Sequence, residues 1–418
     1  MKEVLQLEKY KALRIIKYSD PNLAEQEFTK RINAYCTYKT GIKIQPMQQG
    51  YRQSQSFELF IVNNIELDMM QEKIEENAAV ISDILRKLPI IAREQYYRKV
   101  LTDEILSTNE IEGVRSTKKE INDAFLSMKF KNEHHERFGG IVKSYDSIFY
   151  EKFSPVSEVA EIRKIYDKIL TGEITENNRL DGSLFRTSEV YIHNNTQEIL
   201  HRGDPNEENI IANLELFLNL MNSAEFPYLI KIMMAHYYFE YIHPFYDGNG
   251  RVGRFITCKY LASKLDPLTA ISFSHMINSV RKKYYDAFVE TSDPNNRGEG
   301  TMFVFQMLKI VHQGQKQLIE DLLKKIELLD KIEITLNEIT YKEDLEKRIL
   351  NLLCQSWLFE TTILDSEILE ELNTTRFKAS RAIVNLMRNG YIGKIKSRPA
   401  IHQISDEFGQ RIVDSPTR

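Results

Sequence analysis

One stretch of the chain gathers the residue types that a phosphate-transfer site needs. It reads His243-Pro244-Phe245-Tyr246-Asp247-Gly248-Asn249-Gly250-Arg251-Val252-Gly253-Arg254. Gly248 and Gly250 flank Asn249 and let the backbone turn so that its N–H groups point at one spot, an anion-binding nest. A helix that begins near Arg251 would add the partial positive charge of its N-terminus to this spot. Because Arg251 and Arg254 are three residues apart, they share a face of its first turn, which predicts a polyphosphate site.

Two further side chains of this stretch could take part in group transfer. A carboxylate beside a phosphate site calls for a cation, and Mg²⁺ held by Asp247 and phosphate oxygens is the expected arrangement. His243 can accept a proton near neutral pH, as a base for an incoming hydroxyl must. Each feature alone is more often structural than functional. Their conjunction predicts transfer of a phosphorus group from a nucleoside triphosphate to a hydroxyl.

The flanking residues predict the elements that position this stretch. Residues 228–242 are almost all apolar, which is typical of a buried helix, and Pro244 disfavours its continuation. Residues 184–201 contain two short apolar runs separated by polar residues 194–196, which predicts a β-hairpin with its turn there. The patterns around this hairpin have a helical period, so we expect a mostly α fold.

The stretch resembles the motif of the Fic family, His-x-Phe-x-[Asp/Glu]-Gly-Asn-Gly-Arg-x-x-Arg, at every specified position. Fic proteins are mostly helical and typically transfer AMP from Mg·ATP to a Ser, Thr or Tyr hydroxyl of a target protein. The resemblance implies that His243 is the general base and Asp247 the Mg²⁺ ligand. It also implies that Asn249 and the neighbouring backbone hold the α- and β-phosphates, and that Arg251 and Arg254 pair with the β- and γ-phosphates.

A second match lies upstream and fits the inhibitory pattern of the family, [Ser/Thr]-x-x-x-Glu-[Gly/Asn]. Its specified positions are Thr108, Glu112 and Gly113. The resemblance implies that Glu112 pairs with Arg254 and so withholds the guanidinium from the γ-phosphate, because carboxylate and phosphate compete directly for arginine. The place of this pattern before the Fic core implies the subclass with an N-terminal inhibitory helix, over about residues 92–113, and a low basal activity.

The hairpin expected over residues 184–201 resembles the flap of the family, which clamps the modifiable side chain of the target by strand pairing. Val190, Tyr191 and Ile192 would supply the pairing strand. An edge strand can bind an extended segment through main-chain hydrogen bonds alone. An ordinary surface hairpin is the alternative interpretation.

The composition is that of an ordinary globular protein. The 418 residues are 42% hydrophobic and 28% charged, which predicts two to four domains. A net charge of -4 gives no global electrostatic case for nucleic acid or an anionic membrane. Cys36, Cys258 and Cys354 are widely spaced, which favours reduced thiols over a zinc site. The sequence has neither the apolar stretch of a signal peptide nor that of a membrane helix, so we expect a cytoplasmic protein without a membrane partner.

Changes of pattern along the chain predict five regions. They are a mixed α/β N-terminal extension (1–90), the Fic domain with its inhibitory helix (91–312), a helical connector (313–340), a winged-helix-like domain (341–405) and a tail (406–418). Within the first region we expect a helix over residues 24–39 and a strand over residues 56–62.

The fourth region has the order helix, helix, helix and hairpin, which is that of a winged helix-turn-helix and also occurs in this Fic subclass. Thr374 or Thr375 would cap its third helix. The third helix and the hairpin carry basic side chains, namely Arg376, Lys378, Arg381, Arg388, Lys394, Lys396 and Arg398. Both contact with DNA and docking or dimerisation of proteins fit such a surface.

We therefore expect a protein adenylyltransferase, a nucleotidyltransferase that uses ATP and Mg²⁺ and is inhibited by the pairing of Glu112 with Arg254. Its hydroxyl-bearing target is another protein or the chain itself, and a homodimer is left open. Two alternatives stay open as well. One is another reaction on the same scaffold, either transfer of a different nucleotide or removal of AMP from a modified protein. The other is an ATP-sensing regulator that binds DNA.

Overall fold

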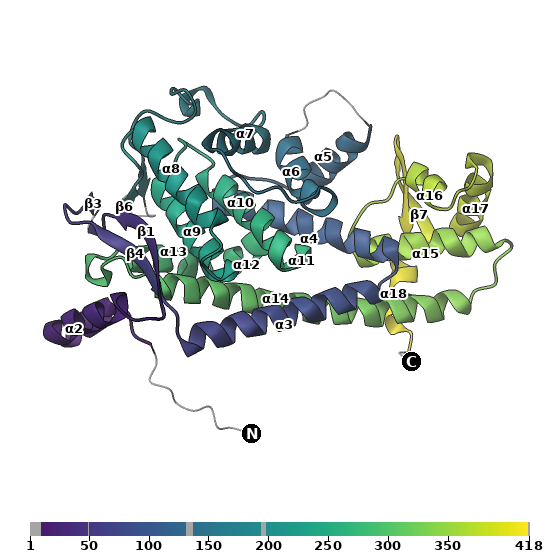
Figure 1. Cartoon of the computed structure of the whole chain (residues 1–418). Helices are drawn as coiled ribbons and strands as arrows, with labels where there is room; N and C mark the ends of the chain where they lie inside the picture. The colour runs from purple at the N-terminus through teal and green to yellow at the C-terminus, as the bar shows by residue number, and fades with distance from the viewer. Residues whose placement is uncertain (1–9, 49, 131–136, 194–197, 417–418) are drawn as a thin grey trace, which may run out of the picture. The chain divides into compact units, whose positions relative to one another are not determined.

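The computed structural model describes residues 10–48, 50–130, 137–193 and 198–416. Most of these residues are helical, and the strands form two-stranded sheets (Figure 1). The prediction of a mostly α protein with a small β-hairpin is therefore confirmed. The chain divides into two compact units: Met1–Glu76 with Glu104–Gly314, and Asn77–Asp103 with Gln315–Arg418.

Three long helices contribute residues to both units: α3 (Ile65–Lys87), α4 (Ile90–Ile111) and α14 (Thr301–Asn337). The other elements of the first unit are α1 (Leu13–Ser19), α2 (Pro21–Ile32), β1 (Thr37–Ile44), β2 (Met47–Gln48), β3 (Tyr51–Arg52), β4 (Phe57–Val62), α5 (Lys118–Phe130), α6 (Gly139–Tyr150), α7 (Val159–Ile169), η1 (Glu176–Asn178), β5 (Tyr191–His193), β6 (Ile199–Arg202), α8 (Glu207–Asn222), α9 (Tyr228–Ile242), α10 (Asn249–Lys264), α11 (Pro267–Ala270), α12 (Phe273–Ser279), α13 (Arg281–Thr291) and η2 (Pro294–Asn296).

The N-terminal residues fold as part of the unit that carries the motif. The strand expected over residues 56–62 is β4, and it pairs antiparallel with β1. The helix expected over residues 24–39 is shorter than predicted, because α2 ends at Ile32 and β1 begins at Thr37. The segment Thr37-Tyr38 is β-branched and aromatic, which favours the strand.

Helices α8, α9 and α10 pack together within the first unit (Figure 1). In α9 every residue is buried except Tyr228, Lys231 and Glu240, so the uniformly apolar pattern predicted this helix correctly. The side chain of Asn206 caps α8 by accepting a hydrogen bond from the Asn209 N–H. These buried helices hold the two ends of the motif loop.

The second unit contains, beyond its parts of the long helices, α15 (Asp344–Leu358), α16 (Asp365–Glu371), α17 (Arg376–Arg388), β7 (Ile392–Ser397), β8 (Ala400–Ile404) and α18 (Asp406–Asp414). Thr375 caps α17 as expected, accepting from the Lys378 N–H at 3.4 Å. Residues 406–414, which we expected in a tail, form α18. The helix and hairpin order is the expected one, and the winged-helix interpretation stays a prediction. Within the described ranges, no helix is long and apolar enough to cross a membrane.

Candidate active site

The motif forms the loop between α9 and α10. His243 ends α9 in the left-handed region, with φ 53°, and its N–H still donates to the Phe239 carbonyl at 3.0 Å. Gly248 precedes α10 with φ 81°, a conformation that glycine adopts without strain. The proline after His243 cannot continue the helix, so the chain turns sharply and His243 lies at the start of the loop.

A buried arginine outside the motif fixes this turn. Arg186 is fully buried and donates to the main-chain carbonyls of His243 and Ile242, at 2.9 and 3.2 Å. It also donates to the carbonyls of Ser188, at 2.6 Å, and Asp204, at 2.5 Å. Burial lowers the pKa of Arg186 to about 10, which leaves the guanidinium charged at neutral pH. One side chain therefore joins the end of α9 to the segment before the hairpin.

We expect Arg186→Met to lower the melting temperature by about 5 °C or more, because each buried carbonyl left without a donor costs about 1–3 kcal/mol. Thermal unfolding monitored by circular dichroism measures this shift. Arg179→Met is the matched control, since Arg179 is 67% exposed in its side chain and pairs with exposed Glu176. An equal shift in both variants would show that Arg186 does not hold the turn.

Two side chains of the motif, those of Asn249 and Phe245, stabilise the loop. The Asn249 amide bonds both ways to the main chain of Phe245: its Oδ1 accepts from the N–H and its Nδ2 donates to the carbonyl, each at 2.8 Å. The ring of Phe245 is buried and stacks on Tyr166 with centroids 4.0 Å apart. The Asn249 side chain is thus engaged in holding the loop, while its main-chain N–H, as the first of α10, lacks an intrahelical acceptor.

Arg251 is held by carboxylates. Its Nη1 lies 2.8 Å from Glu173 Oε2, and its Nη2 lies 3.6 Å from Asp247 Oδ1. The Arg251 side chain is 2% exposed, whereas that of Asp247 is 37% exposed. Asn178 Nδ2 reaches Asp247 Oδ2 at 3.5 Å. Asp247 therefore presents a partly open carboxylate, while Arg251 is already paired.

Arg254 contacts the residues of the upstream pattern. Its Nε donates to Thr108 Oγ1 at 2.9 Å, and its Nη2 donates to the Thr108 carbonyl at 3.1 Å. The same Nη2 lies 2.9 Å from Glu112 Oε1. Gly113 follows with φ 72°, the left-handed conformation that ends a helix. The contact that the resemblance implied between Glu112 and Arg254 is present in the structure.

Gly250 lies directly beneath this ion pair. A Cβ atom at this position would stand 2.2 Å from Glu112 Oε1 and 2.6 Å from Arg254 Nη1. No side chain fits there while Glu112 is docked. The start of α10 and the Glu112 carboxylate therefore share one confined space, and an anion bound at this helix start would compete with Glu112 for it.

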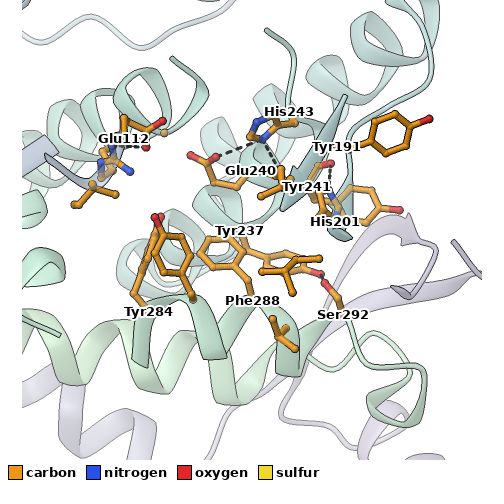
Figure 2. A pocket seen from close by; sticks show the side chains of 17 residues that line it. Glu112, Tyr191, His201, Tyr237, Glu240, Tyr241, His243, Tyr284, Phe288 and Ser292 are labelled. Carbon is orange, nitrogen blue, oxygen red and sulfur yellow. Dashed lines mark hydrogen bonds and ion pairs between the residues drawn. The ribbon is translucent and has the colours of Figure 1, made fainter. Parts of the chain in front are cut away.

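A cavity of about 350 Å³ opens beside these residues. Its lining includes His243, Gly250, Arg254 and Glu112. Figure 2 shows the side chains of His243 and Glu112 on the same side of the cavity. Aromatic residues also line it, namely Tyr237, Tyr241, Tyr284, Tyr285 and Phe288. Figure 2 shows Tyr237, Tyr284 and Phe288 across the cavity from Glu112 and His243. Tyr191 and Ile192 of β5 also line it. The cavity thus has a charged side suited to phosphate and a flat apolar side suited to an aromatic ring.

The hairpin expected over residues 184–201 is formed by β5 and β6, which pair antiparallel with Tyr191 opposite Arg202. Its expected turn at 194–196 lies outside the described residues. Val190 precedes β5, and its carbonyl accepts from the Gly203 N–H at 3.0 Å. The Arg202 guanidinium covers the ring of Tyr51 at 5.0 Å, so the N-terminal hairpin β2–β3 supports β6.

The surroundings of His243 favour its neutral imidazole. Its side chain is 18% exposed. Burial first, and then the Arg186 guanidinium, lowers its pKa to about 4. An imidazole with this pKa is uncharged at neutral pH, as a general base must be.

The structure thus divides the expected site residues into two groups. His243, Gly250, Arg254, Glu112, Tyr191 and Ile192 line the cavity. The other expected site residues are outside the set of lining residues: Asp247 and Gly248 of the loop, Asn249 and Arg251 at the start of α10, and Thr108, Gly113 and Val190. Sequence reasoning missed Arg186, Glu173 and Glu240. Of these, Glu240 alone carries a local signal, because it precedes His243 by three residues and shares its helix face.

Residues 156–261 match the model of the Fic/DOC family. The chain contains a Fic domain. A curated relative from Aedes aegypti named Protein adenylyltransferase Fic is 29% identical over 158 residues, which are 37% of this chain and 29% of that relative. The similarity to this relative therefore spans less than a third of its length.

Solved structures of Fic proteins resemble the chain as well. A Fic family protein from Desulfovibrio desulfuricans G20 is 16% identical, covers 86% of this chain and 99% of its own, and has a TM-score of 0.48. A Fic domain containing signaling protein from Bacteroides thetaiotaomicron VPI-5482 is also 16% identical, covers 62% of this chain and 96% of its own, and has a TM-score of 0.44.

Proposed function

We propose that the Fic domain transfers AMP from Mg·ATP to a Ser, Thr or Tyr hydroxyl. The hydroxyl belongs to a target protein or to the chain itself. The observation that carries this proposal is the shared cavity of His243, Gly250 and Arg254. A neutral base, the start of a helix and a buried guanidinium meet there beside an aromatic wall. This combination suits a nucleoside triphosphate next to an acceptor hydroxyl.

The residues at the loop fit the two expected ligands. The start of α10, with Gly248 and Gly250, offers main-chain N–H groups to phosphate oxygens, and Arg254 adds a positive charge. Asp247 fits Mg²⁺ because its carboxylate is half open and close to this helix start. The cation would supply neutralisation of the phosphate charge. The rings of Tyr284 and Phe288 would pack against the nucleobase.

The chemistry assigned to this chain is proton removal and positioning. His243 would take the proton of the acceptor hydroxyl at Nε2. The hydroxyl oxygen could then bond to the α-phosphorus while the bond to the pyrophosphate oxygen breaks. Arg254 and the N–H groups of α10 would stabilise the negative charge that shifts to the leaving group. Val190, Tyr191 and Ile192 would hold the acceptor segment by strand pairing along β5.

Inhibition by Glu112 belongs to the same proposal. The carboxylate holds Arg254 at 2.9 Å and fills the space above Gly250. A triphosphate in a productive position needs both the guanidinium and this space, so it would have to displace Glu112. We infer that the docked chain is a slow enzyme and that loss of Glu112 activates it.

The experiment is to incubate Glu112→Gly with Mg²⁺ and ATP labelled at either the α- or the γ-phosphate. We expect label on the protein from the α-position only, because AMP transfer releases the γ-phosphate with pyrophosphate. Label from the γ-position would indicate a kinase-type transfer and contradict the proposal. Label from α-labelled GTP, CTP or UTP but not from ATP would identify another nucleotidyltransferase. Release of AMP from a pre-modified protein would favour AMP removal.

A second candidate function rests on the second unit. Residues 374–404 contain no Asp or Glu, and their seven Lys and Arg side chains are all exposed. These residues form α17 and the β7–β8 hairpin, and such a surface fits a DNA backbone. ATP binding without any transfer, together with DNA binding that weakens as salt rises, would favour the ATP-sensing regulator instead.

A further inference from the structure

Glu240 is a charged residue type in a largely enclosed position that the Fic motif does not specify. Its side chain is 12% exposed, and its Oε2 lies 3.8 Å from His243 Nδ1. The same Nδ1 lies 3.3 Å from the main-chain carbonyl oxygen of Glu240. Glu240 Oε1 has no hydrogen-bond partner among the described residues. Figure 2 shows the Glu240 side chain between Glu112 and His243, with dashed lines to His243.

The local structure turns this carboxyl group toward the histidine. Glu240 lies in the last turn of α9, and His243 follows the helix directly, three residues after Glu240. This short spacing brings the two side chains together. Gly253 on α10 leaves the room that Glu240 occupies, because a Cβ there would stand 2.5 Å from Glu240 Oε1. A glycine at this otherwise unspecified position of the motif is therefore needed for Glu240 to lie where it does.

The carboxyl group and the main-chain carbonyl oxygen of Glu240 both lie near Nδ1 of His243. A carbonyl oxygen can only accept a hydrogen bond, so Nδ1 must carry the proton in this contact. The proton on Nδ1 leaves the lone pair on Nε2, the nitrogen that would act as the base. A carboxylate beside Nδ1 favours the same tautomer and also stabilises the imidazolium that forms after proton transfer.

We propose that Glu240 is a positioning residue for His243, holding Nδ1 so that Nε2 is free to take the proton of the acceptor hydroxyl. This inference rests on the proposed transferase function and adds a residue to it. Glu240 acts through His243 and touches no reacting atom.

The charges around Glu240 connect this role to the inhibitory carboxylate. The titratable and charged groups that face it are Glu112 from the turn after α4, Arg254 from α10, Tyr284 and Tyr285 from α13, and His243. Burial first, and then the Glu112 charge, raises the pKa of Glu240 to about 8, against the opposing effect of Arg254. Loss of Glu112 removes one of the raising causes. The pKa of Glu240 then falls, and more of it is a carboxylate at neutral pH.

Departure of Glu112 would therefore have two effects at once. It frees Arg254 for phosphate, and it gives Glu240 the charge with which it supports His243. The pKa of His243 should rise in consequence, because a nearby anion favours the imidazolium.

The test compares Glu112→Gly with the double variant Glu112→Gly/Glu240→Gln. NMR titration of the histidine ring, assigned with His243→Gln, is the first readout and needs no enzymatic activity. We expect His243 to titrate at lower pH in the double variant by about half a pH unit or more, since the facing charge is gone. Glu240→Asp in the same background keeps a charge beside His243. In that variant His243 should titrate at a pH closer to its value in Glu112→Gly.

The second readout is the rate of labelling from α-labelled ATP. We expect kcat to fall by about 10- to 100-fold in the double variant, because part of the rate contributed by the general base is lost. The KM for Mg·ATP should stay unchanged. Since the base must be neutral, the rate is lost on acidification through the pKa of His243. The acid limb of the profile should therefore move to lower pH in the double variant.

Identical His243 titration and identical kcat in the two proteins would overturn the inference. A raised KM with unchanged kcat would overturn it too, because it would assign Glu240 to nucleotide binding. If Glu112→Gly takes up no label from any nucleotide, the proposed function fails. The NMR titration then still decides whether Glu240 faces His243 as a charge.

Discussion

Glu112→Gly is expected to raise the rate of self-labelling from α-labelled ATP by about 10- to 100-fold over the wild type, which lies within the effect of a coupling energy of about 1–3 kcal/mol. Glu112 withholds two things from the nucleotide: the Arg254 guanidinium at 2.9 Å and the space above Gly250. The glycine removes both obstacles, while Thr108 continues to orient Arg254 through its hydroxyl and carbonyl.

Glu110→Gly is the matched control for this activation. Glu110 lies in the last turn of α4, two residues before Glu112, and its carboxylate pairs with Arg281 at 2.7 Å and accepts from Asn278 at 2.9 Å. Glycine at this position loosens the end of α4 without touching Arg254. Equal activation of the two variants would mean that fraying of α4, and not the loss of the Glu112 carboxylate, is what releases the site.

Glu112→Gln separates charge from shape in the same assay. The amide fills nearly the same space but leaves the Arg254 guanidinium without its anionic partner. We expect its labelling rate to lie between those of the wild type and Glu112→Gly. A rate equal to that of the wild type would mean that occupied space alone inhibits.

The local geometry of the site followed from the sequence because it depends on short-range rules. The apolar run before His243 predicted α9, the proline predicted its end, and the glycines around Asn249 predicted the turn into α10. The contact between Glu112 and Arg254 joins residues 142 apart in the chain. It was reached only through resemblance to a family, since nothing in the residue pattern itself brings those two segments together.

The supporting residues escaped prediction for the same reason. Arg186 lies 57 residues before His243, and Glu173 lies 78 residues before Arg251. A single arginine or glutamate in a loop is most often solvated, and only the tertiary fold buries these two. Glu240 is different, because its spacing from His243 could have been read on a helix. It was missed because amphipathic patterns assign a lone polar residue of an apolar helix to the surface.

The limits of the compact units could not be predicted from helical periodicity. The N-terminal extension expected over residues 1–90 stays a prediction. The compact units divide at Glu76 and Asp103, within α3 and α4. Helical periodicity reports where a helix ends and carries no information about which neighbours it packs against, so long helices conceal the limits of compact units.

His243→Ala in the Glu112→Gly background should lower the labelling rate by about 10²- to 10⁴-fold, the usual contribution of a general base. The imidazole is held neutral by burial and Arg186, and Nδ1 is committed to the Glu240 carbonyl at 3.3 Å. Alanine removes the proton acceptor and leaves the phosphate-binding groups in place. Affinity for Mg·ATP, measured by calorimetry, should therefore stay within about twofold of the parent, so that the loss falls on kcat.

Tyr246→Phe in the same background controls for disturbance of the loop. Its hydroxyl donates to Asp181 at 3.0 Å, so the change alters the loop two residues beyond the proline while sparing the imidazole. We expect it to retain most of the labelling rate. Undiminished labelling in His243→Ala would place the base elsewhere, and Glu240 would then be the nearest carboxyl group able to replace it. A loss of ATP affinity equal to the loss of rate would instead assign His243 to binding, which its position at the end of α9 rather than within α10 argues against.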